Sequence, residues 1–191
     1  MNIFDFLINF GYLGIFAIVF TESGIPFGFF FPGDSLLITA GILVNRGIFN
    51  FYLLMGLCIL AAILGNIVGY YLGKKWGRGL FEKKNNFVFN PKNLKRTEDF
   101  YNKYGDRAIL LARFIPVIRT FTPIFAGIAN MKYSKFLLYT IVSAFVWAGG
   151  LISAGYFLVQ LIPNIDQYIL LVVGIIIVLS VAPLIFKIFR K

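Results

Sequence analysis

Two arginines stand inside an otherwise apolar stretch of this sequence, residues 108–131. Arg113 and Arg119 lie six positions apart, and Pro116 between them interrupts the hydrogen bonds of a helix. A guanidinium keeps its charge in a protein, and each one costs roughly 2.5–3.5 kcal/mol at the centre of a membrane helix. A broken helix that carries two cations at membrane depth therefore predicts an anion-binding site.

A second interpretation of these arginines is that they snorkel to one membrane interface, or pair with carboxylates only to hold the fold. The carboxylates nearest in character are Glu22 and Asp34, in another apolar stretch rich in helix breakers. Should the two stretches meet, four charges of balanced sign would share one pocket, in which arginine forks suit phosphate. Burial would favour the neutral acids and arginine the ionised ones, so anion binding could be linked to a proton gradient.

The composition is that of an integral membrane protein with one domain. Of the 191 residues, 59% are hydrophobic and 14% are charged. Histidine is absent and Cys58 is the only cysteine, which excludes His-based catalysis, His or thiolate metal sites and an internal disulfide. We expect no catalytic residue, no metal site and no cofactor. The net charge of +10 comes mostly from one loop, so anionic lipid headgroups explain it better than nucleic acid does.

The two acids belong to a segment that predicts a re-entrant hairpin at about residues 22–44. Residues 4–20, before it, form an apolar run that is short for a full span of about 20 residues, so tilt or partial insertion is expected. Helix breakers separate the acids, among them Pro26, Pro32 and Gly33. Asp34 and the serine after it are typical of a helix start. Residues 45–50 then form a short polar turn.

Residues 51–72 are long and apolar enough to span a membrane. Gly65, Gly69 and Gly73 recur every four residues, so they line one face and allow a second helix to approach closely. Asn66 beside them can add a hydrogen bond between helices. Ordinary close packing explains this stripe better than a binding role does.

Residues 74–107 form a polar, basic segment with ten basic and four acidic residues, which should be cytoplasmic. Within it, residues 93–104 predict an amphipathic helix along the membrane surface. Four of its side chains would face the lipid: Leu94, Phe100, Tyr101 and Tyr104. A solvated basic loop without a role at the lipid is an equally good interpretation.

Residues 108–131 repeat the character of the first hairpin, with Pro116 and Gly127 among the breakers, and predict a second re-entrant hairpin. Apolar spans follow at residues 136–158 and 168–186. Because the basic segment and the basic C-terminus both belong inside, an even number of crossings separates them, and these two spans supply it. The second hairpin then enters and leaves on the cytoplasmic side.

The same reasoning orders the first half. Residues 45–50 lie outside, the first hairpin enters from the outside, and the run at 4–20 begins inside, so both termini are expected in the cytoplasm. Two similar hairpins inserted from opposite faces form an inverted repeat. The predicted fold class is an all-α integral membrane protein, a single domain of residues 1–191 with transmembrane helices and two oppositely oriented re-entrant helical hairpins.

Four sequence elements resemble those of the DedA family, whose domain is also described as the VTT or SNARE-associated Golgi protein domain. They are Glu22-Ser23-Gly24-Ile25-Pro26, then Phe31-Pro32-Gly33-Asp34 leading to Ala40-Gly41, then Gly65-Asn66-Ile67-Val68-Gly69-Tyr70, and the stretch Arg113 to Arg119 with Gly127 downstream. The resemblance covers nearly the whole chain, and four elements in order with matching spacing are specific. Lys74-Lys75 departs from the family, which commonly has an arginine there.

This resemblance implies a carrier of undecaprenyl phosphate in the bacterial inner membrane, or of a phospholipid such as phosphatidylethanolamine, or a scramblase. Arg113 and Arg119 would then bind the substrate phosphate, and Glu22 and Asp34 would couple transport to protons or Na⁺. Helix packing and hairpin hinges would fall to Pro26, Pro32, Gly33, Gly65, Asn66, Gly69, Pro116 and Gly127. The expected partner is a polyprenyl phosphate or phospholipid headgroup, with no nucleic acid, and a homodimer is compatible with it.

Two other classes of function stay open. A membrane enzyme acting on lipid phosphate is disfavoured because the chain has no histidine, although carboxylates alone can bind Mg²⁺. A structural or chaperone-like membrane protein for envelope homeostasis would have little use for four intramembrane charges. An exporter of small ions or antibiotics is a further variant.

Overall fold

The computed structural model describes residues 3–25, 33–76, 91–113 and 115–161, and their regular structure is helical, as predicted. The α-helices are α1 (Ile3–Gly24), α2 (Gly33–Asn45), α3 (Phe51–Trp76), α5 (Pro91–Tyr104), α6 (Ala108–Ala112), α7 (Pro116–Ile128), α8 (Tyr133–Ala144) and α9 (Gly150–Leu161). A 3₁₀ turn, η2 (Gly105–Arg107), and a π-helical turn, η3 (Phe145–Gly149), connect some of them.

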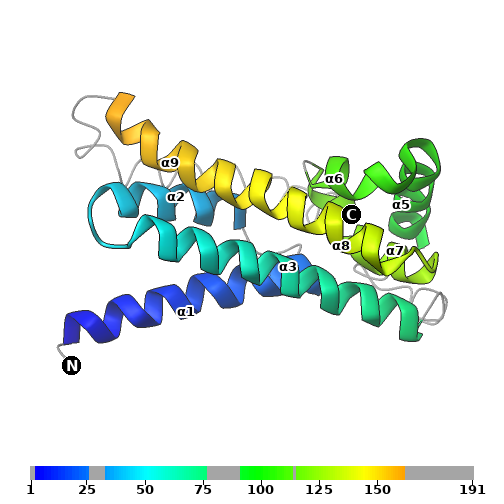
Figure 1. Ribbon diagram of the computed structural model, residues 1–191, viewed down its shortest axis with the longest axis horizontal. Coiled ribbons are helices and arrows are strands. Elements are labelled where there is room, and N and C mark those ends of the chain that lie inside the picture. The colour runs from blue at the N-terminus through cyan, green and yellow to red at the C-terminus, as the bar shows by residue number, and fades with distance from the viewer. Residues whose placement is uncertain (1–2, 26–32, 77–90, 114, 162–191) are drawn as a thin grey trace, which may run out of the picture.

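Two long apolar helices run the length of the molecule in opposite directions (Figure 1). One is α3, and the other is the continuous helix α8–η3–α9 over Tyr133–Leu161; both are long and apolar enough to cross a membrane. They contain the spans predicted at residues 51–72 and 136–158, which are confirmed as apolar helices of that length. The span predicted at 168–186 lies outside the described residues.

Helices α1 and α2 enter the bundle from one end and meet near its middle (Figure 1). At that end the Tyr12 hydroxyl accepts a hydrogen bond of 2.7 Å from the backbone N–H of Asn50. From there α1 runs beside α3 as far as Gly24, which lies against the backbone of Gly65. Helix α2 starts near the same level and returns alongside α9 to the end where α1 began.

This placement corrects the predicted course of the first helix. The sequence predicted a crossing at residues 4–20 followed by a separate hairpin from residue 22, but α1 is one helix through Gly24 and is itself an arm of the pair. Residues Thr21 to Gly24 stay helical because α3 offers them glycine-lined contact. The described start of α1 therefore lies at the end that holds residues 46–50, opposite the basic end.

Helices α6 and α7 approach the middle from the other end. Helix α7 runs outward along α3, where a side chain at Gly73 would meet the carbonyl oxygen of Ile124, and one at Gly127 would meet that of Tyr70. The two backbones are therefore in direct contact, as small residues allow.

Helices α2 and α9 cross in the same reciprocal way. A side chain at Gly41 would meet the carbonyl oxygen of Ile152, and one at Gly155 would meet that of Ile38. Each crossing thus contains two glycines, one in the short helix and one in the long helix. Each glycine lies against a carbonyl oxygen of the facing helix, and that carbonyl belongs to the residue three positions before the facing helix's own glycine. The two crossings fix α2 and α7, and so the groups at their inner ends, against the two long helices.

The amphipathic helix predicted at 93–104 is present as α5, but it does not lie free along a surface. The ring of Tyr101 packs 5.4 Å from that of Phe125 in α7, and Thr97 is buried. Tyr101 was expected to face lipid; instead it covers α7, because the apolar stripe of α5 finds a protein partner there.

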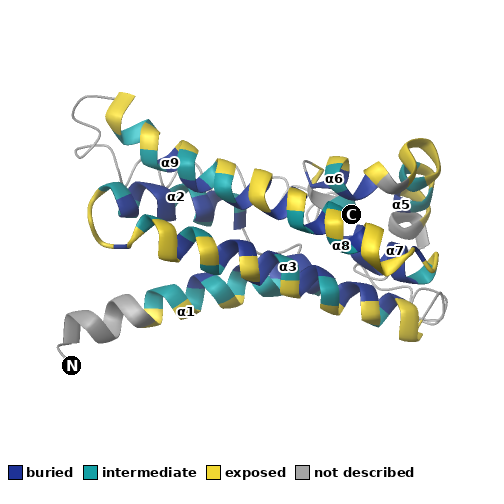
Figure 2. Ribbon diagram, viewed as in Figure 1, coloured by how far each residue is buried: buried dark blue, intermediate teal, exposed yellow. Residues whose placement is uncertain are grey.

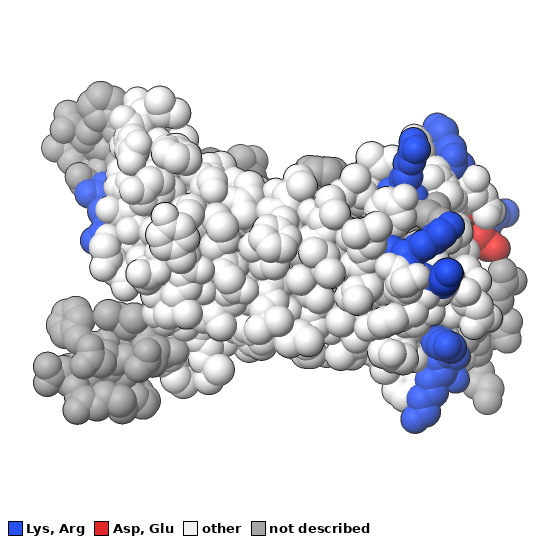
Figure 3. All heavy atoms as spheres, viewed as in Figure 1, with Lys and Arg blue, Asp and Glu red and all other residues white. Residues whose placement is uncertain are grey.

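The surface divides into an apolar band and a basic end. Exposed large apolar side chains follow the outer faces of the two long helices, among them Leu53, Leu60, Leu64, Leu138, Val142, Phe145 and Phe157 (Figure 2). Lysines and arginines gather where α3 ends and α5 lies (Figure 3). Among the residues whose burial the structure describes, the exposed basic ones at that end are Lys74, Lys75, Lys95, Arg96, Lys103, Arg107, Lys132 and Lys135. Such a band beside such an end is typical of a protein oriented in a membrane.

Candidate functional site

The two predicted acids stand at the inner ends of α1 and α2. Glu22 occupies the last turn of α1 and is 2% exposed, whereas Asp34 lies in the first turn of α2 with a side chain that is 40% exposed. An acid in the first turn of a helix faces unpaired backbone N–H groups and is stabilised there. Both carboxylates thus lie in the middle of the bundle rather than at its ends.

The two predicted arginines come from the opposite pair. Helix α6 stops at Ala112, Ile115 is extended with φ −116° and ψ 105°, and Pro116 starts α7 at its first turn. A residue before proline is driven out of the helical region, and proline suits the first position of a helix, so the break is encoded locally. It leaves Arg113 between the helices and Arg119 in the first turns of α7.

Arg119 bridges both acids of the other pair. Its Nη1 donates to the two carboxylate oxygens of Asp34 at 2.7 and 2.9 Å, and its Nη2 donates to Oε1 of Glu22. Arg119 follows Asp34 by 85 positions and Glu22 by 97 positions in the chain, so these bonds connect distant segments. A buried charge is tolerated in such a geometry because its donors and its charge are matched together.

Arg113 has different surroundings. It is 5% exposed and makes no ion pair with a described acid. With the amide of Asn66 oriented so that its oxygen faces the guanidinium, Oδ1 accepts from Nη1 at 2.9 Å and Nδ2 donates to the Ser23 carbonyl at 3.0 Å. Nε and Nη2 of Arg113 are buried without a hydrogen-bond partner among the described residues. Buried donors left unpaired are costly, so a ligand that accepts hydrogen bonds from these two nitrogens would be stabilised here.

Trp147 completes the site, and the sequence analysis did not identify it. Its indole Nε1 donates to Oδ1 of Asp34 at 2.8 Å, and the guanidinium carbons of Arg113 and Arg119 lie 4.5 and 5.3 Å from its ring centre. It sits in the π-helical turn η3, a feature that often marks functional positions. A tryptophan in the centre of a predicted span, rather than at an interface, was the signal that could have found it.

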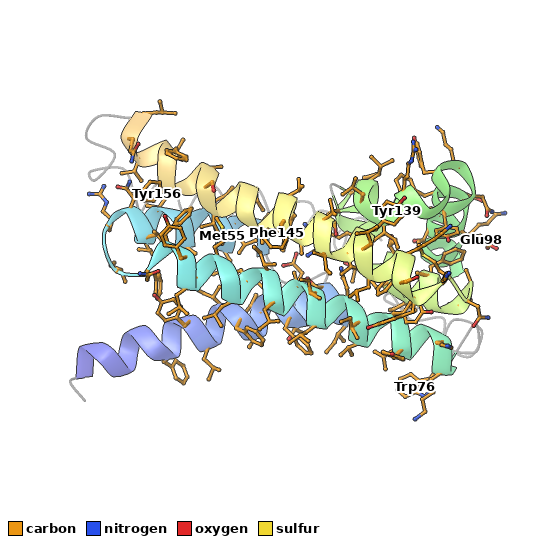
Figure 4. The ribbon with its side chains drawn as sticks, viewed as in Figure 1. Met55, Trp76, Glu98, Tyr139, Phe145 and Tyr156 are labelled. Atoms are coloured by element: carbon orange, nitrogen blue, oxygen red, sulfur yellow. The ribbon has the colours of Figure 1, made fainter. Side chains whose placement is uncertain are left out.

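These groups line a pocket of about 430 Å³ in the middle of the molecule. Its lining residues are Asp34, Arg113, Arg119, Val146, Trp147, Gly150 and Leu151. Val146 is 51% exposed and Gly150 is exposed as well, so the pocket opens sideways at the long helix rather than along the bundle axis. In Figure 4 the labelled Phe145 marks this level, about midway between the two ends.

The remaining predicted positions serve the framework. Gly33 lies against the carboxylate of Glu22, where any side chain would clash, and Asn66 reaches Arg113. Gly65 and Gly69 lie against α1, and Gly127 contacts α3 away from the charges. Pro26 and Pro32 lie outside the described residues.

Taken together, the charges of the site sum to zero, with two acids and two arginines. Among the residues that the structure describes, two kinds of atom in the site are left without a partner: the Nε and Nη2 donors of Arg113 and the Oε2 acceptor of Glu22. A neutral cluster with a free donor pair and a free carboxylate oxygen can take up one anion and one proton without a net change of buried charge.

Comparison with known proteins identifies relatives of the chain. The family model of the VTT domain matches residues 31–157. Protein DedA of Escherichia coli is 39% identical over 181 residues, which cover 94% of this chain and 82% of DedA. A membrane protein of Mycobacterium leprae is 39% identical over 74% of this chain and 64% of its own length. Inner membrane protein YghB of Escherichia coli is 31% identical over 82% of this chain and 71% of YghB. No solved structure matches the chain.

Proposed function

The chain belongs to the DedA family of VTT-domain membrane proteins, and from this premise we propose that it carries a phosphate-bearing lipid between the leaflets of the bacterial inner membrane. The observation that carries the proposal is the buried guanidinium of Arg113, with two unpaired donors beside a pocket that opens sideways. We propose undecaprenyl phosphate as the principal substrate, since a single phosphate on an apolar chain needs one cationic receptor and a lateral route for its tail.

The pocket suits a headgroup whose tail stays in lipid. Val146 and Leu151 supply an apolar wall next to the charged groups, and the opening lies on the apolar band. A headgroup can therefore enter sideways from one leaflet while its hydrocarbon chain remains among lipid tails. A water-soluble anion would gain nothing from that wall.

The proposed topology places the basic end in the cytoplasm, following the excess of lysine and arginine there. The pairs α1–α2 and α6–α7 are then two re-entrant hairpins that enter from opposite faces and meet near the midplane, related as an inverted repeat. The described start of α1 falls on the outer face in this topology. The reciprocal glycine crossings of α2 with α9 and of α7 with α3 support the repeat.

We further propose that Glu22 couples transport to protons, with Na⁺ as the alternative ion. An incoming anion adds a negative charge to a neutral cluster, and a proton on Oε2 of Glu22 restores the balance. Asp34 instead holds Arg119 and Trp147 in place. Lipid transport at equal rates with and without a proton gradient and a Na⁺ gradient would exclude coupling.

Transport of defined fluorescent lipids in proteoliposomes tests the function. A polyprenyl phosphate should cross in wild-type vesicles, and the Arg113→Gln variant should lower the rate at least about tenfold, since charge-assisted hydrogen bonds are the strong ones. Lys132→Gln, at the exposed basic end, is the matched control and should transport normally. Equal rates for Arg113→Gln and wild type would refute the phosphate site.

One observation favours a second substrate, phosphatidylethanolamine. The Asp34 side chain is 40% exposed and lines the same pocket as Arg113, so it can accept hydrogen bonds from an ammonium while the arginine binds the phosphate. Competition between the two lipids in the proteoliposome assay ranks them. A stronger effect of Asp34→Asn on the phosphatidylethanolamine rate than on the polyprenyl phosphate rate would favour this substrate.

A further inference from the structure

The two arginines differ in how many of their N–H donors are free to bind a ligand. The Nη1 and Nη2 groups of Arg119 are occupied by Asp34 and Glu22. Arg113 has only the Asn66 oxygen, on Nη1, and its Nε and Nη2 point to no described partner. An anion bound by Arg119 would have to displace two carboxylates, one of them the buried Glu22, whereas an anion bound by Arg113 fills two vacant donors and breaks no ion pair.

Arg113 is nevertheless covered. The guanidinium carbon lies 4.5 Å from the centre of the Trp147 ring, at which distance the indole shields one face of the cation. The unpaired nitrogens have no access to solvent, although Arg113 and Trp147 both line the pocket. Trp147 is held in this place by its hydrogen bond of 2.8 Å to Asp34.

The π-helical turn η3 explains why Trp147, rather than a neighbouring residue of the same helix, faces the guanidiniums. Tyr70 and Ile152 hold matching places in the two long helices, because each carbonyl oxygen lies against a glycine of a facing short helix. Asn66 lies four residues before the first and Trp147 five residues before the second. An α-helix turns about 100° per residue, so an offset of five residues without a π-helical turn would point Trp147 in another direction than Asn66. The extra residue in η3 compensates for this difference, and both side chains therefore reach the guanidiniums, each from its own long helix.

We propose that Arg113 alone receives the anion of the substrate, and that Trp147 is a gate that must leave Arg113 before the anion can bind. The proposal rests on the proposed function, because it specifies how that same pocket takes up a phosphate headgroup. Opening breaks the hydrogen bond from the indole to Asp34 and moves the ring away from the guanidinium of Arg113. Arg119 keeps both carboxylates throughout and is a positioning residue for Asp34 and Glu22.

Tryptophan fluorescence can follow the gate directly. The chain has two tryptophans, and Trp76 is an exposed residue at the far end of α3 (Figure 4), so Trp76→Phe leaves Trp147 as the only reporter. The full-length variant in maltoside micelles, a detergent without phosphate, is titrated with dodecyl phosphate, inorganic phosphate or dodecanol. Dodecyl phosphate should shift the Trp147 emission saturably, dodecanol should not, and inorganic phosphate should do so at least about tenfold more weakly because it lacks the apolar chain.

Two substitutions separate the roles, with binding followed by calorimetry. Arg113→Gln should weaken dodecyl phosphate binding at least about tenfold. Trp147→Phe keeps an aromatic cover but loses the bond to Asp34, so it should bind about threefold to tenfold more tightly, because the closed state is less favoured. A purely structural tryptophan would give weaker binding or none.

The outcomes also distinguish this inference from the proposed function. Saturable binding with no change in Trp147 emission, and with Trp147→Phe no tighter than wild type, would overturn the gate while leaving a phosphate site. Full binding by Arg113→Gln would overturn the assignment of the receptor. Absence of dodecyl phosphate binding in wild type and in every variant would count against the lipid-phosphate function itself.

Discussion

Basic side chains occupy two regions of this molecule with opposite surroundings. At the end formed by α5 and the last turns of α3, lysines and arginines are exposed and outnumber the acids (Figure 3). In the middle, Arg113 is buried and the Arg119 side chain is 12% exposed, and they lie beside an equal number of acids, Glu22 and Asp34. Water solvates any excess of charge at the end, whereas in the middle the two acids and two arginines sum to zero, because unbalanced charge is costly away from water. Position, rather than residue type, therefore decides what an arginine contributes.

The middle region contains a second contrast. Arg119 is joined to both acids, and Arg113 to an amide and an aromatic ring. The first pattern stabilises the fold, and the second keeps hydrogen-bonding capacity in reserve. Three substitutions separate these situations by their effect on stability.

The largest effect is expected at Arg119. Arg119→Met leaves Glu22 buried without a cation, and breaking a buried pair in this way costs about 3–5 kcal/mol. The free energy of unfolding in mixed detergent micelles measures it. Adding Glu22→Gln to the variant should recover part of the loss, because the unmatched charge is then gone. No recovery would show that the arginine acts by packing alone.

A smaller effect of opposite sign is expected at Arg113. Arg113→Met removes a buried cation that has no acid partner, so the protein should be unchanged or up to about 2 kcal/mol more stable, less the cost of the freed Asn66 oxygen. The same unfolding measurement checks this, and the variant should have lost phosphate binding. A loss as large as that of Arg119→Met would erase the contrast between the two arginines.

The smallest effect is expected at the basic end. Lys132→Gln changes an exposed side chain, so stability should change by no more than about 0.5 kcal/mol. Lipid transport in proteoliposomes should also match the wild type. A change comparable to that at Arg119 would show that the basic end takes part in the fold and would remove the distinction drawn between the two regions.

Much of the architecture could be predicted from local sequence. The spans at 51–72 and 136–158 followed from length and hydropathy, and the break before α7 followed from Pro116. The course of α1 was predicted wrongly, because Glu22 and Ser23 look like the end of an apolar helix. The helix continues to Gly24, which packs against Gly65, and that contact lies between distant parts of the chain.

The candidate site was predicted in part. The four charged residues were singled out because charge in an apolar segment is costly wherever it ends up. Their pairing was not predictable, since sequence spacing does not say which arginine meets which acid. Trp147 was missed because hydropathy treats it as one more aromatic residue in a span, and the π-helical turn that aims it has no clear sequence signature.

By itself the sequence determined that this chain is helical, apolar and interrupted at two charged places, because hydropathy, proline and unneutralised arginine act locally. Tertiary structure alone decided that α1 starts at the same end of the molecule at which α2 ends. It also decided that Arg119 binds both acids, and that Arg113 has donors without a described partner beneath the ring of Trp147. The physical reason is that these features depend on backbones brought into contact at glycines far apart in the chain, where one residue more or less turns a side chain about 100° away from its partner.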